Sequence, residues 1–296
     1  MALLFATSRI AARLGLHFEV ASINHGLREE SEKEVHFVQK LSEGLGAAFH
    51  TQSLHMGLHR GLQAGLEAKA RQLRYAALEE IRQRQQLGWV VTAHTASDQA
   101  CTLLMNLSRG AALSGARGIW RRRGFLVRPM LRMRRAEVEA YVQQISLSAV
   151  ADSMNQEERF FRVRMRRGLL KHLEKAAGPQ ATLHLAQFCR YADEDEGFLS
   201  QLALRALQRI QVSATTLDTL AFLCLEKPLQ RRVLALFLRR NALEVDSKHI
   251  DNAILAIRAN KNATLTRDCL LKPEKGLILM TTAPPRKKAC KKRLLS

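Results

Sequence analysis

The sequence predicts an α/β protein with a doubly wound parallel sheet, followed by a smaller and mainly helical second domain. Strand-like and helix-like segments alternate over about the first 145 residues, which is typical of parallel strands joined by crossover helices. The character of the chain changes near Gly178 and Pro179, beyond which helix-forming residues dominate. The chain has 296 residues, 47% of them hydrophobic, and is therefore long enough for two cores.

The first half of the chain provides the elements of the predicted sheet. Apolar and β-branched residues indicate strands at residues 17–24, 47–54, 88–94 and 124–129. Apolar residues at helical spacing indicate helices at residues 29–46, 66–86, about 97–108 and 135–147. Ligands of such sheets sit outside the carboxyl ends of the strands. The segments around residues 24 and 94 are therefore the first places to look for chemistry.

The amino-terminal segment also has helical spacing. Its apolar and small side chains recur on one helical face, at Leu3, Leu4, Thr7, Ile10, Ala11 and Leu14. This pattern predicts an ordinary core helix. An organellar transit peptide is the alternative, because the segment contains Arg and Ser and no acidic residue. We favour the core helix because the segment leads directly into the first strand.

The second half of the chain divides into three predicted parts. After a first domain at residues 1–178, we expect a connecting helix at 179–212 and a small helical domain at 213–283 that ends in the strand-like segment GLILMTT. Residues 284–296 form a basic tail, which is either a solvated end or a source of added RNA affinity.

Charge and cysteine content limit the class of protein. The chain has 47 Lys and Arg against 27 Asp and Glu, a formal net charge of +20, which favours a nucleic-acid partner because bound phosphates release counterions. The five cysteines are widely spaced and form no CxxC pair, which argues against a disulfide framework or a zinc site and for a reducing cytoplasm. No apolar run reaches membrane-spanning length.

Polar and basic side chains gather at the predicted strand ends and on two helices. Asn24 and His25 end one strand, and His94 ends another. Arg71 and Arg74 are three residues apart and therefore share a helical face. A further basic run contains Arg162, Arg164, Arg166 and Arg167, and guanidinium groups bind phosphates in bidentate fashion. The alternatives are satisfied structural histidines and solvated basic faces.

Five motifs in a fixed order point to a known family. They are NHGLR (24–28), EAKARQLRY (67–75), TAHTASDQACTLLMNLSRG (92–110), RPMLRMRRAEVEAY (128–141) and DSMNQEERFFRVRMR (152–166). In this order the set resembles the tRNA(Ile)-lysidine synthase family, a branch of the PP-loop or N-type ATP pyrophosphatases. The resemblance covers residues 1 to about 173, and PLQRRVLALFLRR (228–240) is similar to the small carboxyl-terminal domain of the family.

The resemblance implies a ligase that acts on tRNA. ATP with Mg²⁺ would adenylate the C2 oxygen of the wobble cytidine in the isoleucine tRNA with a CAU anticodon, and lysine would then displace AMP to give lysidine. It also implies a cytoplasmic protein that is not bound to a membrane and is compatible with a homodimer. The implied catalytic residues are Asp98 and His94; the nucleotide-binding ones are Asn24, His25, Arg109 and Gly110; the tRNA-binding ones are Arg28, Arg71, Arg74, Arg162, Arg164 and Arg166. No metal ligand is assigned, and Gly110 is also explained as a helix cap.

The sequence departs from the family pattern at several positions. The phosphate loop Ser-Gly-Gly-x-Asp-Ser and the strand before it are absent from the sequence, which predicts a gap or an unpaired edge in the sheet. Ser97 and Cys101 stand where the family has acids, which leaves Asp98 alone. Ala111 and Ala112 replace a Thr-Gly pair, and Val163 replaces an Asn. We expect Cys101 to be a small apolar filler.

Two classes of function remain open at this point. The first is a lysidine-forming ligase whose true start lies upstream of Met1. The second is a non-catalytic or degenerate relative that binds tRNA without chemistry. A related tRNA thiolase is disfavoured because the chain has no paired cysteines, and generic DNA binding is disfavoured because no helix-turn-helix or zinc-finger spacing occurs.

Overall fold

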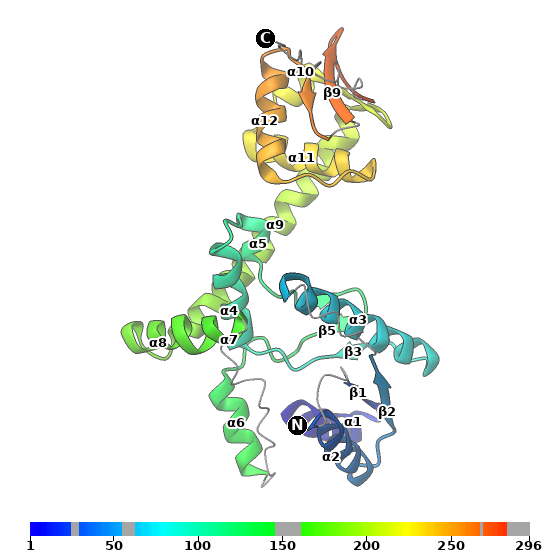
Figure 1. The fold of residues 1–296 in the computed structure, drawn as a ribbon, viewed down its shortest axis with the longest axis vertical. Coiled ribbons are helices and arrows are strands. Elements are labelled where there is room, and N and C mark those ends of the chain that lie inside the picture. Colours follow the sequence, from blue (N-terminus) through cyan, green and yellow to red (C-terminus); the bar gives the residue numbers. More distant parts are fainter. Residues whose placement is uncertain (25–29, 55–62, 146–160, 267–268, 283–296) are drawn as a thin grey trace, which may run out of the picture. The chain divides into compact units, whose positions relative to one another are not determined.

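The computed structural model describes residues 1–24, 30–54, 63–145, 161–266 and 269–282. The chain divides into two compact units, Met1–Asp193 and Glu194–Ser296. Helix α9 (Ala181–Ile210) contains the boundary between them (Figure 1). The predicted limits of the domains, at residues 178, 212 and 283, stay predictions.

The first unit begins with alternating strands and helices, as the sequence predicts. Its elements up to the middle of the unit are α1 (Ala2–Leu14), β1 (Val20–Asn24), α2 (Glu30–Gly44), β2 (Phe49–Ser53), α3 (Gln63–Arg84), β3 (Val90–Val91) and α4 (Ala96–Leu107). The elements that follow are α5 (Leu113–Ala116), β4 (Arg122–Arg123), β5 (Leu126–Val127), α6 (Arg135–Gln144), α7 (Phe161–Arg164), the π-helical turn η2 (Met165–Leu170) and α8 (Lys171–Ala177). The mixed α/β class with parallel strands is confirmed.

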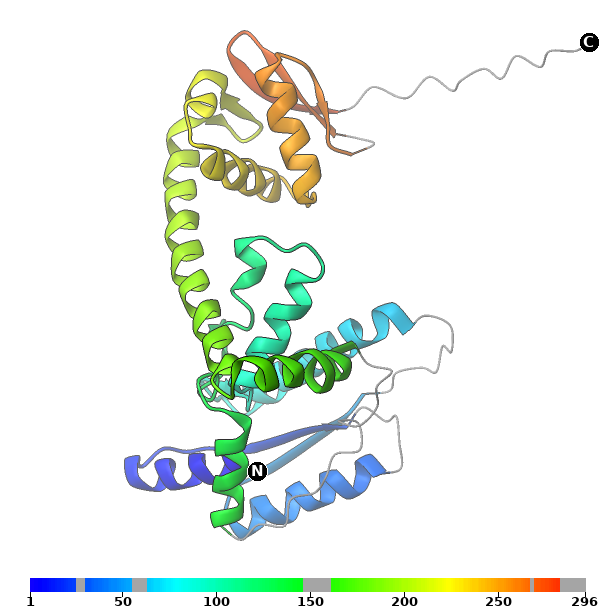
Figure 2. The same ribbon diagram turned by 90° about the vertical axis from the view of Figure 1, so that its left-hand side faces the viewer.

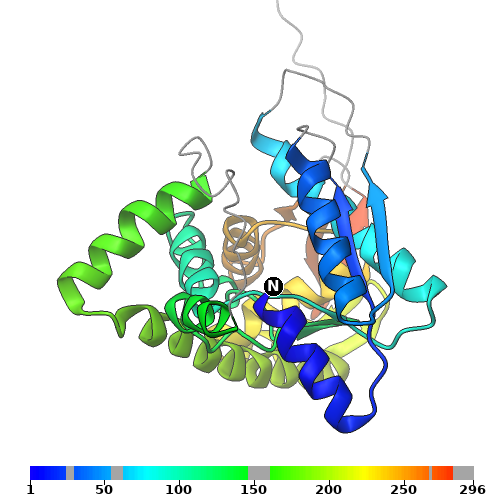
Figure 3. The same cartoon turned by 90° about the horizontal axis from the view of Figure 1, so that it is seen from below.

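The sheet of the first unit is divided into two pieces among the described residues. Strands β1 and β2 pair in parallel from Val20↔Phe49 to Asn24↔Ser53, and α2 packs along them (Figures 2 and 3). Strands β3 and β5 pair in parallel, and β4 pairs with β5 in antiparallel fashion, so the order is β3-β5-β4. Within the described residues β1 therefore has one strand neighbour and β3 has one, in line with the predicted interruption of the sheet.

Helix α4 lies at the centre of the packing in the first unit. Leu103 contacts Ala116 of α5 and Cys189 of α9 in one buried cluster. Ala100 and Cys101 contact Leu170 of η2 in another. Apolar residues on two sides of α4 thus fix this helix between its neighbours, and its first turn is held in a defined place.

Helix α1 forms as predicted but is buried less than a core helix would be. Ala2 packs against Met130 and Val142, in a small cluster that includes α6. Ile10 and Leu14, on the predicted apolar face, are 53% and 67% exposed. Ala11, in the last turn, is 5% exposed, so this turn is buried at one position while Ile10 and Leu14 lie at the surface.

The second unit combines helices with a sheet of five strands. The strand order is β6 (Gln211–Ser213), β7 (Thr216–Asp218), β10 (Leu277–Thr282), β9 (Cys269–Glu274) and β8 (Ala263–Thr264), all antiparallel. The helices are α10 (Thr219–Leu223), α11 (Lys227–Arg240) and α12 (Ser247–Arg258). Its core includes Phe222, Phe237 and Leu271, each 0% exposed.

The sheet of the second unit is larger than the sequence indicates. Only the segment that became β10 has a strand-like pattern, whereas β6, β7 and β8 have two or three residues each. Such short segments show no measurable periodicity.

Across the described residues, no helix is long and apolar enough to span a membrane.

Candidate functional site

The start of helix α4 positions the one carboxylate expected to take part in chemistry. Thr95 is the N-cap, and Asp98 is the third residue of the helix. Asp98 Oδ2 accepts hydrogen bonds from the Thr95 backbone N–H at 2.9 Å and from the Thr95 hydroxyl at 3.1 Å. This capping box satisfies helix donors that would otherwise lack partners. One oxygen of Asp98 is therefore used to hold the helix start.

The other oxygen of Asp98 binds an arginine from a distant part of the chain. Arg162 Nη2, on α7, donates a hydrogen bond to Asp98 Oδ1 at 2.9 Å. Burial alone would raise the pKa of Asp98, but the Thr95 backbone hydrogen bond and the Arg162 charge outweigh it, so the pKa lies below its usual range. Asp98 is therefore an anion that holds Arg162 in place.

His94 lies directly before this helix start and is neutral at physiological pH. Burial lowers its pKa to about 4, with Asp98 opposing the decrease and Arg128, Arg71 and Arg162 adding to it. Its Nδ1 lies 3.0 Å from the Thr92 hydroxyl. Because the ring is uncharged near pH 7, His94 adds a polar surface and no further positive charge to the site.

Tyr75 and Arg128 also belong to this site, although the sequence suggested no role for them. Arg128 is 4% exposed; its Nη2 donates to the Tyr75 hydroxyl at 3.4 Å, and its Nη1 donates to the Trp120 carbonyl at 2.8 Å. Arg71 lies over the Tyr75 ring at 5.1 Å. Burial would raise the pKa of Tyr75, but the Arg128 hydrogen bond and the charges of Arg71, Arg128 and Arg74 lower it overall.

The basic run after residue 161 approaches the same carboxylate. Arg166, on η2, has a pKa lowered by burial and by the charge of Arg135, whereas Asp98 opposes the decrease. Arg164 lies over the ring of Phe161 at 5.7 Å. We define the Asp98 cluster by seven residues: Arg71, Tyr75, His94, Asp98, Arg128, Arg162 and Arg166. This cluster contains four guanidinium groups and one carboxylate. Such a surplus of positive charge suits a polyanionic ligand.

Comparison with known proteins decides the family. The profile of the PP-loop domain matches residues 1–173. The chain belongs to the PP-loop family. It is 31% identical over 269 residues to a tRNA(Ile)-lysidine synthase from Bacillus thuringiensis subsp. konkukian, covering 86% of this chain and 56% of that one. A tRNA(Ile)-lysidine synthase from Novosphingobium aromaticivorans is 41% identical over 173 residues, 56% of this chain and 51% of that one.

These relatives are longer than the chain described above. A third, the tRNA(Ile)-lysidine synthase from Geobacillus kaustophilus, is 34% identical over 229 residues, which are 74% of this chain and 49% of that one. The chain thus spans about half the length of the curated relatives it matches. A solved U34-tRNA thiolase from Methanococcus maripaludis overlaps 59% of the chain with a TM-score of 0.45 and 14% identity, which is too distant to bear on the site.

Two predicted nucleotide-binding residues of this PP-loop protein lie beyond the far end of α4 from Asp98. The Arg109 guanidinium nevertheless lies 5.2 Å from the centre of the ring of Phe161, the residue before Arg162. Arg109 and Gly110 follow the last turn of α4, roughly 14 Å along the helix from Asp98 at 1.5 Å per residue. Gly110 has φ 76°, and its N–H donates to the Leu107 carbonyl at 2.9 Å, so it closes the helix end. Open space surrounds the position of its missing Cβ, so the geometry is compatible with both the cap and the ligand-binding interpretation.

The other predicted residues are distributed as follows. Asn24 ends β1, where its carbonyl accepts a hydrogen bond from Leu54 at 2.7 Å. Arg74 lies on α3, where its charge acts on Tyr75. His25 and Arg28 fall outside the described residues. Their predicted roles, like those of the whole set, stay predictions.

Cys101, one of the residues that depart from the family pattern, is buried in the first unit. Cys101 is 1% exposed and packs against Ala100 and Leu170, and burial raises the pKa of its thiol to about 11. It is therefore an apolar filler, as expected.

The described residues contain no group of three His, Cys, Asp or Glu side chains that could hold a metal ion. Since Asp98 already binds Arg162, this side of the site does not fit Mg²⁺, whereas its guanidinium groups fit the phosphates of ATP or RNA.

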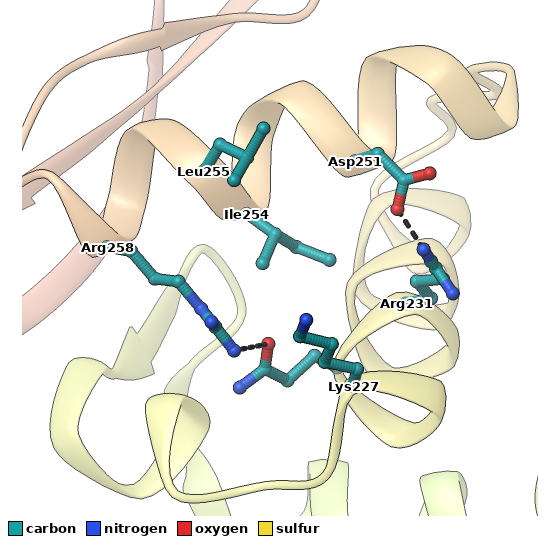
Figure 4. Close-up of a pocket in the computed structure, with 7 residues that line it drawn as sticks. Lys227, Arg231, Asp251, Ile254, Leu255 and Arg258 are labelled. Carbon is teal, nitrogen blue, oxygen red and sulfur yellow. Dashed lines mark hydrogen bonds and ion pairs between the residues drawn. The ribbon is translucent and has the colours of Figure 1, made fainter.

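The second unit has a pocket of about 250 Å³ between α11 and α12 (Figure 4). It is lined by Lys227, Gln230, Arg231, Asp251, Ile254, Leu255 and Arg258. Arg231 is paired with Asp251 at 2.6 Å, and Arg258 donates to the buried Gln230 at 3.1 Å. None of the residues predicted from the sequence lies here. The pocket is a weaker candidate for a polyanion than the Asp98 cluster because its three cations and one carboxylate leave a smaller excess of positive charge than four guanidinium groups and one carboxylate.

Proposed function

We propose that this PP-loop protein is a tRNA-modifying ligase of the lysidine-forming type. In this reaction the C2 oxygen of the wobble cytidine of tRNA(Ile) attacks the α-phosphate of ATP, pyrophosphate leaves, and the lysine amine then displaces AMP. The observation that supports the proposal best is the Asp98 cluster, which gathers four guanidinium groups around a single carboxylate at the start of α4. This charge distribution suits a substrate rich in phosphate.

Each part of the cluster has a distinct role in this proposal. Arg71, Arg162 and Arg166 attract and orient phosphates, since guanidinium groups form paired hydrogen bonds with phosphate oxygens. Arg128 is buried and fixes Tyr75, so it is a positioning residue. Neutral His94 accepts a hydrogen bond without repelling the cationic lysine.

A second candidate function is tRNA binding without chemistry. It is favoured by the state of the carboxylate, because both oxygens of Asp98 have partners within the protein and the neighbouring positions hold Ser97 and Cys101. An anion that is paired in this way attracts the ammonium group of lysine less than an unpaired one would. The ligase requires Asp98 or another acid to receive that ammonium group.

The two functions are separated by one pair of measurements on the purified 296-residue chain. ATP–pyrophosphate exchange is measured with an isoleucine tRNA transcript and lysine, and tRNA binding is measured by filter retention. Exchange that depends on the tRNA supports the ligase. Retention of tRNA without exchange supports the binding relative, and the loss of both refutes the proposed function.

Matched variants test whether the Asp98 cluster is the relevant site. Asn can still accept the capping hydrogen bond from Thr95 but has no charge for Arg162, so Asp98→Asn should reduce exchange at least tenfold while the chain stays folded. Asp251→Asn removes an ion-paired carboxylate of the second unit and should leave exchange unchanged. Equal effects of the two substitutions would remove the cluster from the mechanism.

A further inference from the structure

Both tryptophans of the chain lie just before strands of the small sheet β3-β5-β4 and are partly exposed. Trp89 directly precedes β3 and is 47% exposed, and Trp120 precedes β4 and is 37% exposed. Tryptophan has the largest apolar surface of any side chain, so leaving two of them at the surface has a cost in water. The lysidine-forming reaction as proposed above uses neither of them.

Each indole ring is stacked by arginine. The Arg122 guanidinium lies 4.1 Å from the centre of the Trp89 ring. Arg117 and Arg123 lie 4.3 Å and 5.2 Å from the centre of the Trp120 ring. All three distances are within the range of cation–π attraction. Because successive side chains of a strand point to opposite faces, Arg122 and Arg123 place one stacked pair on each face of β4.

The edge strand β4 also has an uncompensated positive charge. Arg121, Arg122 and Arg123 are consecutive and exposed, and none of them has a carboxylate partner within the described residues. Arg117 differs, because its guanidinium group is paired with Asp193 at 2.5 Å. Three neighbouring cations repel one another unless an anion lies among them, so this edge is complementary to a run of phosphates.

The backbone under this edge is rigidly held. Gln99 is buried; its Oε1 accepts from the Ile119 N–H at 2.5 Å, and its Nε2 donates to the Ile119 carbonyl at 3.1 Å. Gly118 has φ 64°, and a Cβ there would lie 2.7 Å from the Gln99 oxygen. Arg128 holds the carbonyls of Trp120 and Arg121 through its side chain and its backbone N–H. A surface prepared in this way loses little conformational entropy when it binds a ligand.

We propose that this surface, the tryptophan–arginine edge (Trp89, Trp120, Arg121, Arg122 and Arg123), is an RNA-binding site distinct from the Asp98 cluster. The guanidinium groups bind phosphates of the RNA backbone, and the exposed indole rings stack against unpaired bases. The inference rests on the proposed function in one respect, namely that the partner is RNA. It adds a second contact surface, outside the reacting site.

Protection of an exposed strand edge is the other role that cations have at such a position. That role requires charge alone and does not explain why two indole rings lie beside the arginines at the surface. An RNA partner accounts for both features, because its backbone is anionic and its unpaired bases have flat aromatic faces.

The protein offers a direct spectroscopic test. Trp89 and Trp120 are the only tryptophans of the chain, so its indole fluorescence reports this edge alone. Titration of the whole chain with the tRNA transcript should quench or shift the emission. The midpoint of this change should equal the midpoint of the binding curve measured by filter retention. Trp89→Phe and Trp120→Phe assign the change to one ring or to both.

A charge-matched pair of variants tests the role of the arginines. The combined substitution R121Q/R122Q/R123Q should lower tRNA affinity. Because each lost phosphate contact changes the slope of log affinity against log salt by about 0.7 to 0.9, the slope should become less steep by about two to three. The control R205Q/R209Q/R239Q removes the same net charge from exposed positions elsewhere and should change the slope by less than one. Circular dichroism of both variants verifies that they are folded.

The outcomes also separate this inference from the proposed function. If the unmodified chain binds no tRNA, the proposed function fails. If it binds tRNA with unchanged tryptophan emission, and the two triple variants behave alike, the tryptophan–arginine edge is not an RNA site although the protein remains a tRNA binder. Heparin, which has charge but no bases, should displace RNA without quenching; equal quenching by heparin would refute the base-stacking part.

Discussion

Lowering the pH from 7 to 5 should destabilise the first unit through His94. The pKa of this histidine is lowered from 6.5 to about 4, mainly by burial. Between pH 6.5 and pH 4 the unfolded chain therefore binds a proton at this histidine, whereas the folded chain does not. Because the folded pKa is the lower one, the stabilisation is complete above pH 6.5 and is lost as the pH falls toward 4.

The size of this effect follows from the two pKa values. At pH 5 an unfolded histidine is almost fully protonated and the folded one is still neutral. With about 1.4 kcal/mol for each pKa unit, the free energy of unfolding should fall by about 2 kcal/mol between pH 7 and pH 5. A single half-buried side chain would thus account for a large part of the pH dependence of the unit.

Urea unfolding followed by tryptophan fluorescence is the appropriate assay. Both tryptophans lie in the first unit, so the signal reports this unit. His94→Gln should remove most of the decrease between pH 7 and pH 5, while His184→Gln, at an exposed position of α9, should leave it as in the unmodified chain. The reasoning is refuted if His94→Gln has the same pH dependence as the unmodified chain.

Three further predictions concern the packing and the ion pair. Asp98→Asn should lower the free energy of unfolding of the first unit by about 1–2 kcal/mol at pH 7, and a double-mutant cycle with Arg162→Met should give a coupling of about 1 kcal/mol; additive effects would contradict a direct pair. Cys101 should resist iodoacetamide at pH 8 until the chain unfolds, because its thiol is buried with a pKa of about 11; peptide mass spectrometry would show labelling of the native protein if this is wrong. Phe237→Ala should cost the second unit about 3–5 kcal/mol, measured by hydrogen exchange of the α11 amides, and unchanged protection would exclude Phe237 from the core.

Helices α1, α2, α3, α4 and α6 of the first unit could be predicted from the sequence. The shorter α5, α7 and α8 were not predicted, and the strands could be predicted only in part. The helices at residues 29–46 and 66–86 agree with α2 and α3 to within three residues. The predicted strand at 88–94 is reduced to two residues, Val90 and Val91. Helical spacing is a local property, but a strand exists only where a neighbour supplies hydrogen bonds. Strand length therefore depends on pairing that the sequence does not show.

The second unit shows the same limit more strongly. Its strands β6, β7 and β8 have no sequence pattern of their own, and Pro273 in β9 argues against a strand there. They form because β10 supplies a partner, directly to β7 and through β7 or β9 to the others, and because the sheet covers the core beside α11 and α12. A prediction of a mainly helical second unit is thus correct in its helices but incomplete in its sheet.

The candidate site divides in a similar way. The sequence indicated Asp98, His94, Arg71, Arg162 and Arg166 through their motifs, and the structure brings these residues together. The sequence did not indicate a role for Tyr75 or Arg128, although both lie in the quoted motifs. A buried arginine beside a tyrosine is recognisable only when the burial of Arg128 is known.

The sequence by itself determined the family, through five motifs in a fixed order, and its net charge of +20 predicts a polyanionic partner. Only the tertiary structure decided that Asp98 binds Arg162, which is 64 residues away. That contact depends on the packing of η2 against α4, where Leu170 meets Cys101. A side chain reaches only a few ångströms, so the packing of apolar surfaces elsewhere in the fold selects which charges meet.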